Sequence, residues 1–428
     1  MLETLKNAWK IKEIRNKILF SILIILIFRI GSVIPVPYID VAALKSATAA
    51  GSTNEFFSYL SILTGGGLEY GAIFAMSVTP YINSSIIVQL LCVAIPALER
   101  LSKEGEEGQK KLAQITRYAT VILALIQGIA YFIYLKSGNF LSVTGGWVVF
   151  AAIVIVLAFT AGSALVMWLG EQIDEKGIGN GISVLLFAGI LSRGPQAFSA
   201  LFTYWKDYKE YAAVIGIIVV FLVVIAFVVW MTEAERRLPV QYAKRVVGNK
   251  MYGGQNTHIP IKVNMSGVMP IIFASSILML PTMILSFMKA QNPPTSMYKF
   301  LSLFSVRGLF YAVIYFILII GFAYFYATIQ FNPVEMANNL RKNGGAIPGI
   351  RPGKPTSDFI SKILSRITLM GAIFLSVIAI LPIVIGNVGK INISLGGTSL
   401  LIMVGVALDI VRNLESQMMM RHYKGFLD

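Results

Sequence analysis

Residues whose side chains could do acid–base, nucleophilic or metal chemistry are few in this sequence and lie far apart. The two histidines, His258 and His422, stand in separate polar segments, and the only cysteine, Cys92, lies inside an apolar run. These residues form neither a multi-histidine metal site nor an intrachain disulfide. No His-Glu-x-x-His motif, paired intramembrane aspartates or Gly-x-Ser-x-Gly elbow occurs. We therefore predict a protein that is not an enzyme, with no catalytic residues, cofactor or metal.

Charged residues are also scarce inside the apolar runs. Ion-coupled transporters and intramembrane proteases place ionisable groups near the centre of the bilayer, where they are costly. Here Arg29 lies in the outer half of the first run, Glu171 at the end of the fourth, and Asp409 near the end of the last. Each is explained as an interfacial group whose charged end reaches the headgroup region. A secondary transporter is therefore the second interpretation, and an intramembrane enzyme the third.

The composition predicts a membrane protein. Of 428 residues, 56% are hydrophobic and 13% are charged, whereas soluble proteins carry about 25% charged residues. A membrane-spanning helix needs roughly 20 mostly apolar residues. Nine runs satisfy this rule, near 18–36, 71–96, 115–135, 147–169, 212–231, 266–288, 308–329, 367–386 and 395–411. A tenth, near 181–201, has only a short apolar core before Arg193.

The distribution of basic residues supports ten spans. With ten, 26 of the 36 Lys and Arg residues fall on the side that holds both chain ends, and nine on the other. Because basic residues accumulate in cytoplasmic loops, both ends are predicted to be cytoplasmic. The net charge of +15 is then mostly a topological feature and not a sign of nucleic-acid binding. Two long basic loops, 232–265 and 330–366, protrude on this side and suit partner docking.

Five spans in each half force the two halves into opposite orientations, an inverted repeat. The second span of each half carries a proline followed by small polar residues. These are Pro80 with Asn83, Ser84 and Ser85, and Pro270 with Ser275 and Ser276. Small residues let helices pack closely in many bundles. The matched positions also fit a functional seam at which the two halves touch without interlocking.

Residues 55–70 are apolar enough to enter a membrane but too short to cross it. A re-entrant helix and an interfacial loop are equally good interpretations. Gly65, Gly66 and Gly67 form the flexible end of this segment.

Several long segments resemble the bacterial SecY family, the central channel subunit of the Sec protein translocon. They are FRIGSVIPVP, SVTPYINSSIIVQLL, EGEEGQKKLAQITRY, WLGEQIDEKGIGNGIS, THIPIKVNMSGVMPIIFASSI, IPGIRPGKPT and LGGTSLLIMVGVALD. The resemblance extends from the first span to the last. It implies an all-α membrane protein with ten transmembrane helices in two inverted five-helix halves around a central pore.

The resemblance also implies roles for individual residues. An aliphatic pore ring would comprise Val78, Ile82, Ile182, Leu186, Met269 and Ile402. A lateral gate between spans two and seven would include Pro80, Asn83, Ser84, Ser85, Pro270, Ser275 and Ser276. A plug near 57–70 would include Leu60, Ile62, Leu63, Gly65 and Gly66. Arg351, Lys244 and Arg245 would contact cytoplasmic partners. Spacing alone makes the ring residues ordinary packing residues, and Arg351 an ordinary hydrated loop residue.

The function implied is conduction of unfolded secretory polypeptides across the bacterial plasma (inner) membrane, with lateral release of transmembrane segments into lipid. The implied partners are the SecE and SecG subunits, the SecA motor, the ribosome and signal-sequence-bearing preproteins, with no specific nucleic acid beyond the ribosome. The expected divisions are a cytoplasmic amphipathic N-terminus (1–17), a first half (18–201), an external hinge loop (202–211), a second half (212–411) and a cytoplasmic tail (412–428).

Overall fold

Helices make up most of the protein. The computed structural model describes residues 9–49, 61, 64–206, 211–242, 245–247, 250–252, 256–265, 267–290, 295–304, 308–389 and 397–424. The first half contains α2 (Lys12–Gly31), α3 (Val41–Ala49), α5 (Thr79–Ala94), α6 (Pro96–Lys103), α7 (Glu106–Ser137), α8 (Trp147–Lys176), α9 (Gly181–Leu191) and α10 (Gly194–Lys206). The second contains α11 (Tyr211–Glu233), α12 (Met269–Ala290), α13 (Thr295–Ser302), α14 (Leu309–Gln330), α15 (Pro333–Lys342), α16 (Lys354–Gly389) and α17 (Gly397–Lys424).

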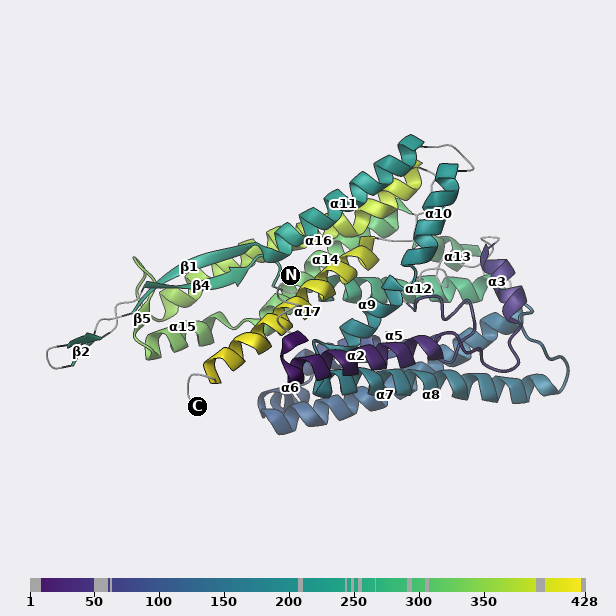
Figure 1. The fold of residues 1–428 in the computed structure, drawn as a ribbon, viewed down its shortest axis with the longest axis horizontal. Coiled ribbons are helices and arrows are strands. Elements are labelled where there is room, and N and C mark those ends of the chain that lie inside the picture. Colours follow the sequence, from purple (N-terminus) through teal and green to yellow (C-terminus); the bar gives the residue numbers. More distant parts are fainter. Residues whose placement is uncertain are drawn as a thin grey trace.

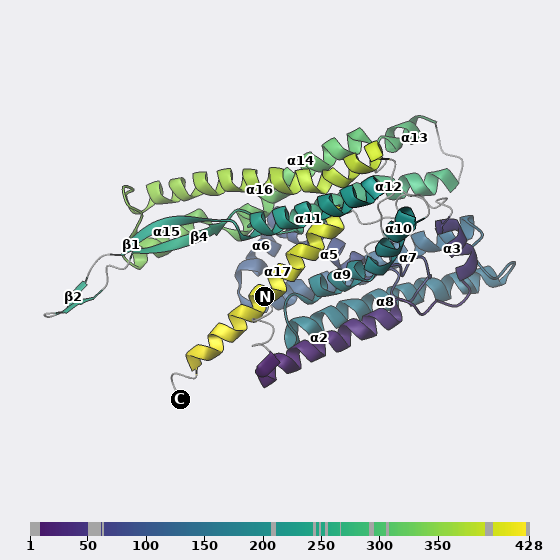
Figure 2. The ribbon, with the colours of Figure 1, turned by 45° about the horizontal axis from the view of Figure 1, so that its top comes forward.

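The two halves form separate groups of helices that meet along α17 (Figures 1 and 2). In the first half, α7 packs against both α5 and α8, while α2 and α9 pack on α8. In the second half, α14 packs against both α12 and α16, while α11 packs on α17. Helix α17 also packs against α9 of the first half. The last helix of the chain therefore joins the two halves.

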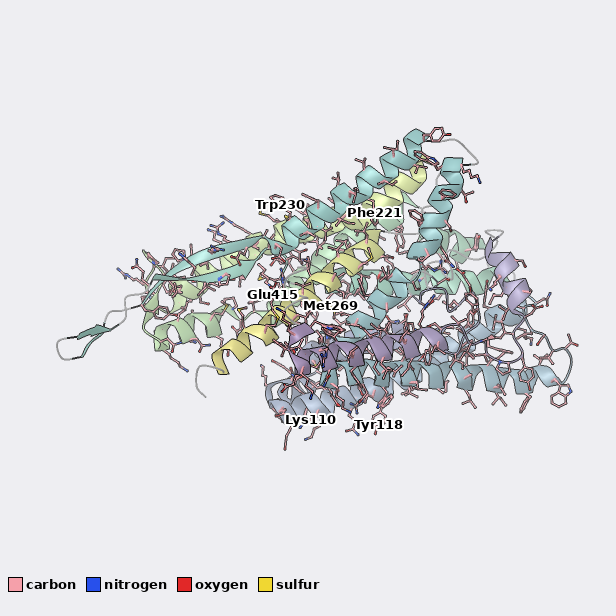
Figure 3. The ribbon with its side chains drawn as sticks, viewed as in Figure 1. Lys110, Tyr118, Phe221, Trp230, Met269 and Glu415 are labelled. Carbon is pink, nitrogen blue, oxygen red and sulfur yellow. The ribbon has the colours of Figure 1, made fainter. Side chains whose placement is uncertain are left out.

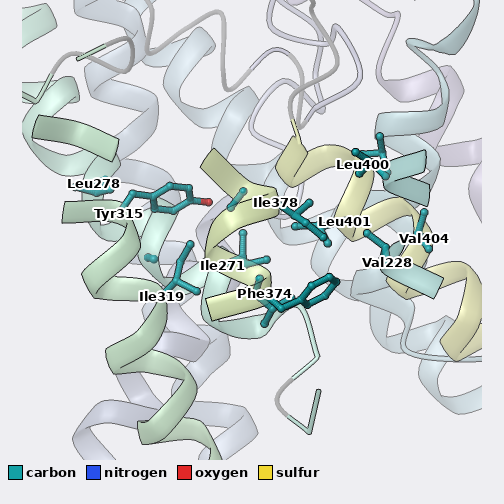
Figure 4. Packing of buried hydrophobic residues seen from close by; sticks show 14 of the residues in the cluster. Val228, Ile271, Leu278, Tyr315, Ile319, Phe374, Ile378, Leu400, Leu401 and Val404 are labelled. Carbon is teal, nitrogen blue, oxygen red and sulfur yellow. The ribbon is translucent and has the colours of Figure 1, made fainter. Parts of the chain in front are cut away.

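A buried apolar cluster fills the second half (Figure 4). Ile271 and Leu278 of α12 contribute to it together with Tyr315 and Ile319 of α14 and Phe374 of α16. All five side chains are less than 10% exposed. Lipid tails are as apolar as these side chains, so close packing, and not expulsion of water, stabilises such a cluster in a membrane.

The outer surfaces of several helices are apolar as well. On α11, Leu222 is 59% exposed and Trp230 is 66% exposed. A helix that is apolar on all sides yet exposed suits a lipid environment, because its backbone groups are satisfied within the helix. Five described helices have the length and composition of membrane spans, and α5 with α6 would make a sixth, bent by 104°. The protein is a multi-pass membrane protein.

Each of the ten predicted apolar runs coincides with helical structure, but the run at 181–201 folds as two helices. Helix α9 begins where the Asn180 side chain accepts a hydrogen bond from the Ser183 backbone N–H at 3.0 Å. It ends at Leu191, and α10 begins at Gly194 after a turn containing Ser192 and Arg193. The short apolar core of this run corresponds to α9 alone.

The second run, 71–96, also differs from a simple span, because α5 begins only at Thr79. Residues 71–78 form turns, with Gly71 and Ser77 in the left-handed region. This segment is apolar because it is buried inside the protein, and not because it crosses the membrane as a helix. Pro80 and Pro270 are the second residues of α5 and α12. The matched prolines therefore begin helices and do not interrupt them, a position where the missing N–H of proline costs nothing.

The strands lie with α15 at one end of the molecule, opposite α3 and α13 (Figure 1). Strand β1 (Glu235–Tyr242) pairs antiparallel with β4 (Asn256–Lys262) and with β5 (Gly345–Ala346). Strands β2 (Arg245–Val247) and β3 (Lys250–Tyr252) form a separate antiparallel pair. The apolar face of β1 and β4 packs on the first turns of α16 in one buried cluster. The long loops predicted at 232–265 and 330–366 are thus one folded unit mounted on α16.

Candidate functional site at the junction of the two halves

Five of the six predicted ring residues lie in one apolar cluster, called the ring cluster below. Val78 precedes α5, Ile82 lies in its first turn, Ile182 and Leu186 belong to α9, and Ile402 to α17. Val78, Leu186 and Ile402 are 1%, 4% and 3% exposed. Ile182 and Leu186 are four residues apart on α9 and therefore share one face of that helix. Helices from both halves therefore meet in an apolar cluster, to which the five ring residues contribute aliphatic side chains.

Met269, the sixth predicted ring residue, is the first residue of α12 and is half-buried (Figure 3). Its neighbours Val268 and Ile272, and not Met269 itself, pack against the ring cluster. The opposite face of α12, with Ile271 and Leu278, packs into the core of the second half. Helix α12 thus has one face in its own half and one toward the ring cluster. The pore-lining role of all six residues stays a prediction.

Helices α5 and α12 contact each other, as a gate between spans two and seven requires, and this contact is called the seam below. It is small compared with the contacts of α5 with α7 and of α12 with α14. Among the predicted gate residues, four are buried and three are half-buried. The buried ones are Pro80, Ser84, Pro270 and Ser275, and the others are Asn83, Ser85 and Ser276.

The polar side chains of α5 and α12 are incompletely hydrogen-bonded. Ser275 Oγ donates to the Ile272 carbonyl at 2.9 Å, and Ser85 Oγ accepts from Gln89 at 3.4 Å. Asn83 Oδ1 and Ser84 Oγ are buried with no partner among the described residues. A buried polar atom without a partner costs about 1–3 kcal/mol. Helix α5 therefore carries groups that would gain hydrogen bonds in a wetter environment.

Gly65 and Gly66, predicted as the flexible end of a plug, adopt left-handed backbone angles of φ 66° and 92°. A side chain on Gly65 would collide with the Gly189 carbonyl of α9, since an added Cβ would lie 2.6 Å from that oxygen. The segment from Gly65 to Gly71 forms turns and is not helical. Its backbone is anchored at Leu68, whose carbonyl accepts a hydrogen bond from the Tyr131 hydroxyl at 2.8 Å.

Charged side chains hold the same segment from two sides. Arg29 of α2 donates to the Gly65 carbonyl at 3.1 Å, and so does the Ser192 hydroxyl at 3.4 Å. Arg193 donates to Ser61 Oγ at 2.5 Å and forms an ion pair with Glu69. The Ser61 hydroxyl in turn donates to Glu69 at 2.7 Å.

The predicted roles missed most of these polar residues. Arg29 was expected to reach the membrane interface, but it bonds to the backbone at Gly65. Glu69 and Arg193 were assigned no role, although Arg193 is only 9% exposed. A cation inside an apolar run is costly unless it is paired, and this signal was present at both arginines. The pairing itself joins residues 124 positions apart, which local sequence patterns do not reveal.

The predicted partner-contact residue Arg351 is exposed in a tight turn between β5 and α16. Gly349 and Gly353 on either side have φ angles of 82° and 107°. The Arg351 carbonyl accepts a hydrogen bond from the Thr356 hydroxyl at 2.8 Å, which ties the turn to α16. Of the other predicted contacts, Arg245 begins β2. Lys244 and the plug residues Leu60, Ile62 and Leu63 lie outside the described residues.

Metal-binding clusters are absent from the described part of the chain. No group of three or more His, Cys, Asp or Glu side chains that could hold a metal occurs there. Glu171 forms an ion pair with Arg117 at 2.6 Å, which links α8 to α7. Within the described residues, the junction of the halves therefore offers no set of metal ligands.

Comparison with known proteins agrees with this arrangement. Residues 72–411 match the SecY family model. The protein translocase subunit SecY of Thermotoga maritima is 42% identical over 435 residues, which cover 100% of this chain and 98% of that protein. A solved structure described as a protein-conducting channel superimposes with a TM-score of 0.63 at 16% identity, covering 94% of this chain and 92% of that one. Sec61 from a canine ribosome-channel complex superimposes with a TM-score of 0.59 at 16% identity, and the match covers 94% of this chain and 92% of that one.

These likenesses extend over nearly the whole chain and include the segments that form the ring cluster and the seam. The identity to the Thermotoga relative identifies the family, and the two solved structures support the fold. The chain belongs to the SecY family of protein translocase subunits, which are channel proteins and not enzymes.

Proposed function

We propose that the protein is the channel-forming subunit of a protein translocase, which passes unfolded polypeptides across a membrane and releases apolar segments sideways into lipid. The observation that carries this proposal is the ring cluster, in which aliphatic residues of α5, α9 and α17 from both halves pack together. A narrow apolar constriction hinders water and ions. Because it carries no charge, it has no preference for one translocated sequence over another.

The sideways exit would be the seam between α5 and α12. Three features support it: the small contact between the two helices, the proline start of each, and the unpaired polar atoms of Asn83 and Ser84. A helix of a passing chain that inserts there would leave most of the packing of α5 on α7 and of α12 on α14 intact.

The function is tested by reconstitution. The purified protein, combined with SecE and SecG in lipid vesicles, is expected to carry a signal-bearing precursor into the vesicle lumen only when SecA and ATP are present. Protection of the precursor from added protease measures the transfer. Transfer of the precursor without SecA and ATP would contradict the proposal. So would the absence of any transfer by a well-folded protein.

The same proposal places the protein in a bacterial plasma membrane, as its likeness to bacterial translocase subunits suggests. Both chain ends and the β1–β4 unit would face the cytoplasm, on the side with most of the basic residues. Ser361 is exposed on α16 near this unit. In a Cys92→Ser background, we expect Ser361→Cys to react with a membrane-impermeant maleimide from the cytoplasmic side alone. Reaction from the outside would overturn the orientation.

The exposed turn at Arg351 is proposed as a contact for the SecA motor or the ribosome. Relatives of known structure include the ribosome-bound canine Sec61 channel. Arg351→Glu reverses a charge at a hydrated tip and removes no buried contact, so the protein should still fold and insert.

We expect Arg351→Glu to slow SecA-driven translocation several-fold while leaving the thermal unfolding midpoint unchanged. Lys342→Glu, at the exposed C-terminal end of α15 on the same unit, is the matched control for a change of charge. Equal translocation rates in wild type and Arg351→Glu would show that Arg351 is not a contact for the motor. Equal slowing in both variants would mean that overall charge, and not this turn, matters.

A further inference from the structure

The polar groups around Gly65 form a cluster that the proposed channel function leaves unexplained. We call Arg193, Ser61 and Glu69, together with Arg29 and Ser192 on the Gly65 carbonyl, the latch. Ser61 is 2% exposed and Arg193 is 9% exposed. Arg29, Glu69 and Ser192 are half-buried. An unpaired charge in such partly buried surroundings is costly.

The latch joins elements that bear ring residues. Arg193 follows α9, which carries Ile182 and Leu186. Glu69 belongs to the turn segment that leads directly to Val78 and α5. The side chain of Arg193 therefore ties the end of one ring-bearing helix to the approach to another. Moving the segment 64–71 away from α9 would break the Arg193–Glu69 ion pair and the hydrogen bond from Ser192 to the Gly65 carbonyl.

From this geometry we infer that Arg193 is a positioning residue that holds the channel closed through Glu69, and that the latch releases only when water enters the junction. Breaking this largely buried ion pair leaves two charges without partners. Water admitted by an opening ring would solvate both charges, so separation becomes favourable only in the wetted state. Displacement of the segment 64–71 and wetting of the ring cluster would then depend on each other. This inference rests on the proposed channel function.

Buried ion pairs are weak contributors to overall stability, but removing one partner is strongly unfavourable. Glu69→Gln leaves Arg193 buried without a counter-charge, and Arg193→Gln leaves the half-buried Glu69 without its partner. Either change penalises the closed arrangement more than a wetted one. The double variant Glu69→Gln with Arg193→Gln buries no charge and retains groups that can hydrogen-bond.

The test measures ion leak through the reconstituted resting protein in planar bilayers, without precursor or motor. We expect each single variant to raise the leak at least about tenfold, since removing one partner of a buried pair costs more than a factor of ten. The double variant should leak no more than the worse single variant, because the two residues act as one unit. Additive effects, or no change in either single variant, would overturn the inference.

Two further variants separate a latch from a general loss of structure. Glu171→Gln breaks the Arg117–Glu171 pair within the first half and should leave the leak unchanged. Ser61→Ala removes only the hydroxyl that bridges Arg193 and Glu69, and should raise the leak even if the charge variants fold poorly. A leak in Glu171→Gln equal to that in Glu69→Gln would also overturn the inference.

A readout with precursor distinguishes a positioning role from a merely structural one. Two precursors would be compared, one with an intact signal sequence and one with a shortened signal core. In the single latch variants, the translocation rates of the two precursors should differ less than in the wild type. A uniform loss of transfer for both precursors would indicate a structural role and contradict the inference. If wild-type protein moves no precursor at all, the proposed function fails, whereas the latch is still judged by the leak of the resting protein.

Discussion

Replacing Ile82 and Ile402 together with asparagine is expected to convert the resting protein into an ion-leaking one. Both side chains belong to the ring cluster, one from each half, and Ile402 is only 3% exposed. Two amides placed there would be buried without partners at a cost of about 1–3 kcal/mol each. A wetted ring satisfies them, so the balance should shift toward the open arrangement by roughly tenfold or more. Conductance in planar bilayers measures the effect.

The control for this change is Ile87→Asn, on the same helix but 43% exposed and outside the ring cluster. It adds the same amide to α5 outside the ring cluster, so its conductance should match wild type. Unchanged conductance in the Ile82→Asn and Ile402→Asn double variant would mean that these residues are ordinary packing residues. A leak as large in Ile87→Asn would point to damage of α5 and not to the ring.

A covalent link across the seam is expected to stop transport completely and reversibly. In a Cys92→Ser background, cysteine pairs from Asn83–Ile87 of α5 and Ala274–Leu278 of α12 would be scanned for oxidation in the resting state. At least one pair should form a disulfide, because the two helices contact each other. Entry of a signal helix needs the space that the link removes, so oxidation should abolish translocation of a precursor and reductant should restore it.

The matched control for the seam link is a disulfide inside the first half. A Cβ on Gly128 of α7 would lie 3.6 Å from Cγ1 of Val156 of α8, so the two positions are neighbours across the contact between these helices. Oxidation of Gly128→Cys with Val156→Cys should leave translocation unchanged, because α7 and α8 are not expected to separate. Continued translocation and membrane insertion with a fully oxidised seam pair would make the seam a static contact and refute the gate.

The sequence was sufficient for the positions of the helices but not for how some of them begin. Long apolar runs and the asymmetry of basic residues identify spans because the bilayer demands internally satisfied backbone and excludes charge. The same criterion included residues 71–78, which are apolar and buried yet non-helical. Apolar composition reports that a segment avoids water, and it does not separate a helix in lipid from a turn buried in protein.

The sequence predicted the apolar residues of the candidate site but not its polar contacts. The aliphatic residues of the ring cluster were identified through resemblance and helical spacing, and five of them are now seen to lie together. Met269 packs less closely than its neighbours, because the face of α12 that meets the cluster passes through Val268 and Ile272. The Arg193–Glu69 pair was beyond prediction, since it depends on how the segment before α5 folds back against the end of α9.

The length of helix α16 allows it to transmit force from the β1–β4 unit to the membrane-embedded helices. Its 36 residues correspond to roughly 54 Å at 1.5 Å per residue, well beyond the 20 or so residues that a bilayer requires. One end carries the β1–β4 unit and the Arg351 turn, and the rest packs on α12, α14 and α17. A force applied at the Arg351 turn would therefore be transmitted along the single helix α16 to α12, which borders the seam. A docked motor or ribosome would have leverage on the exit path without touching it.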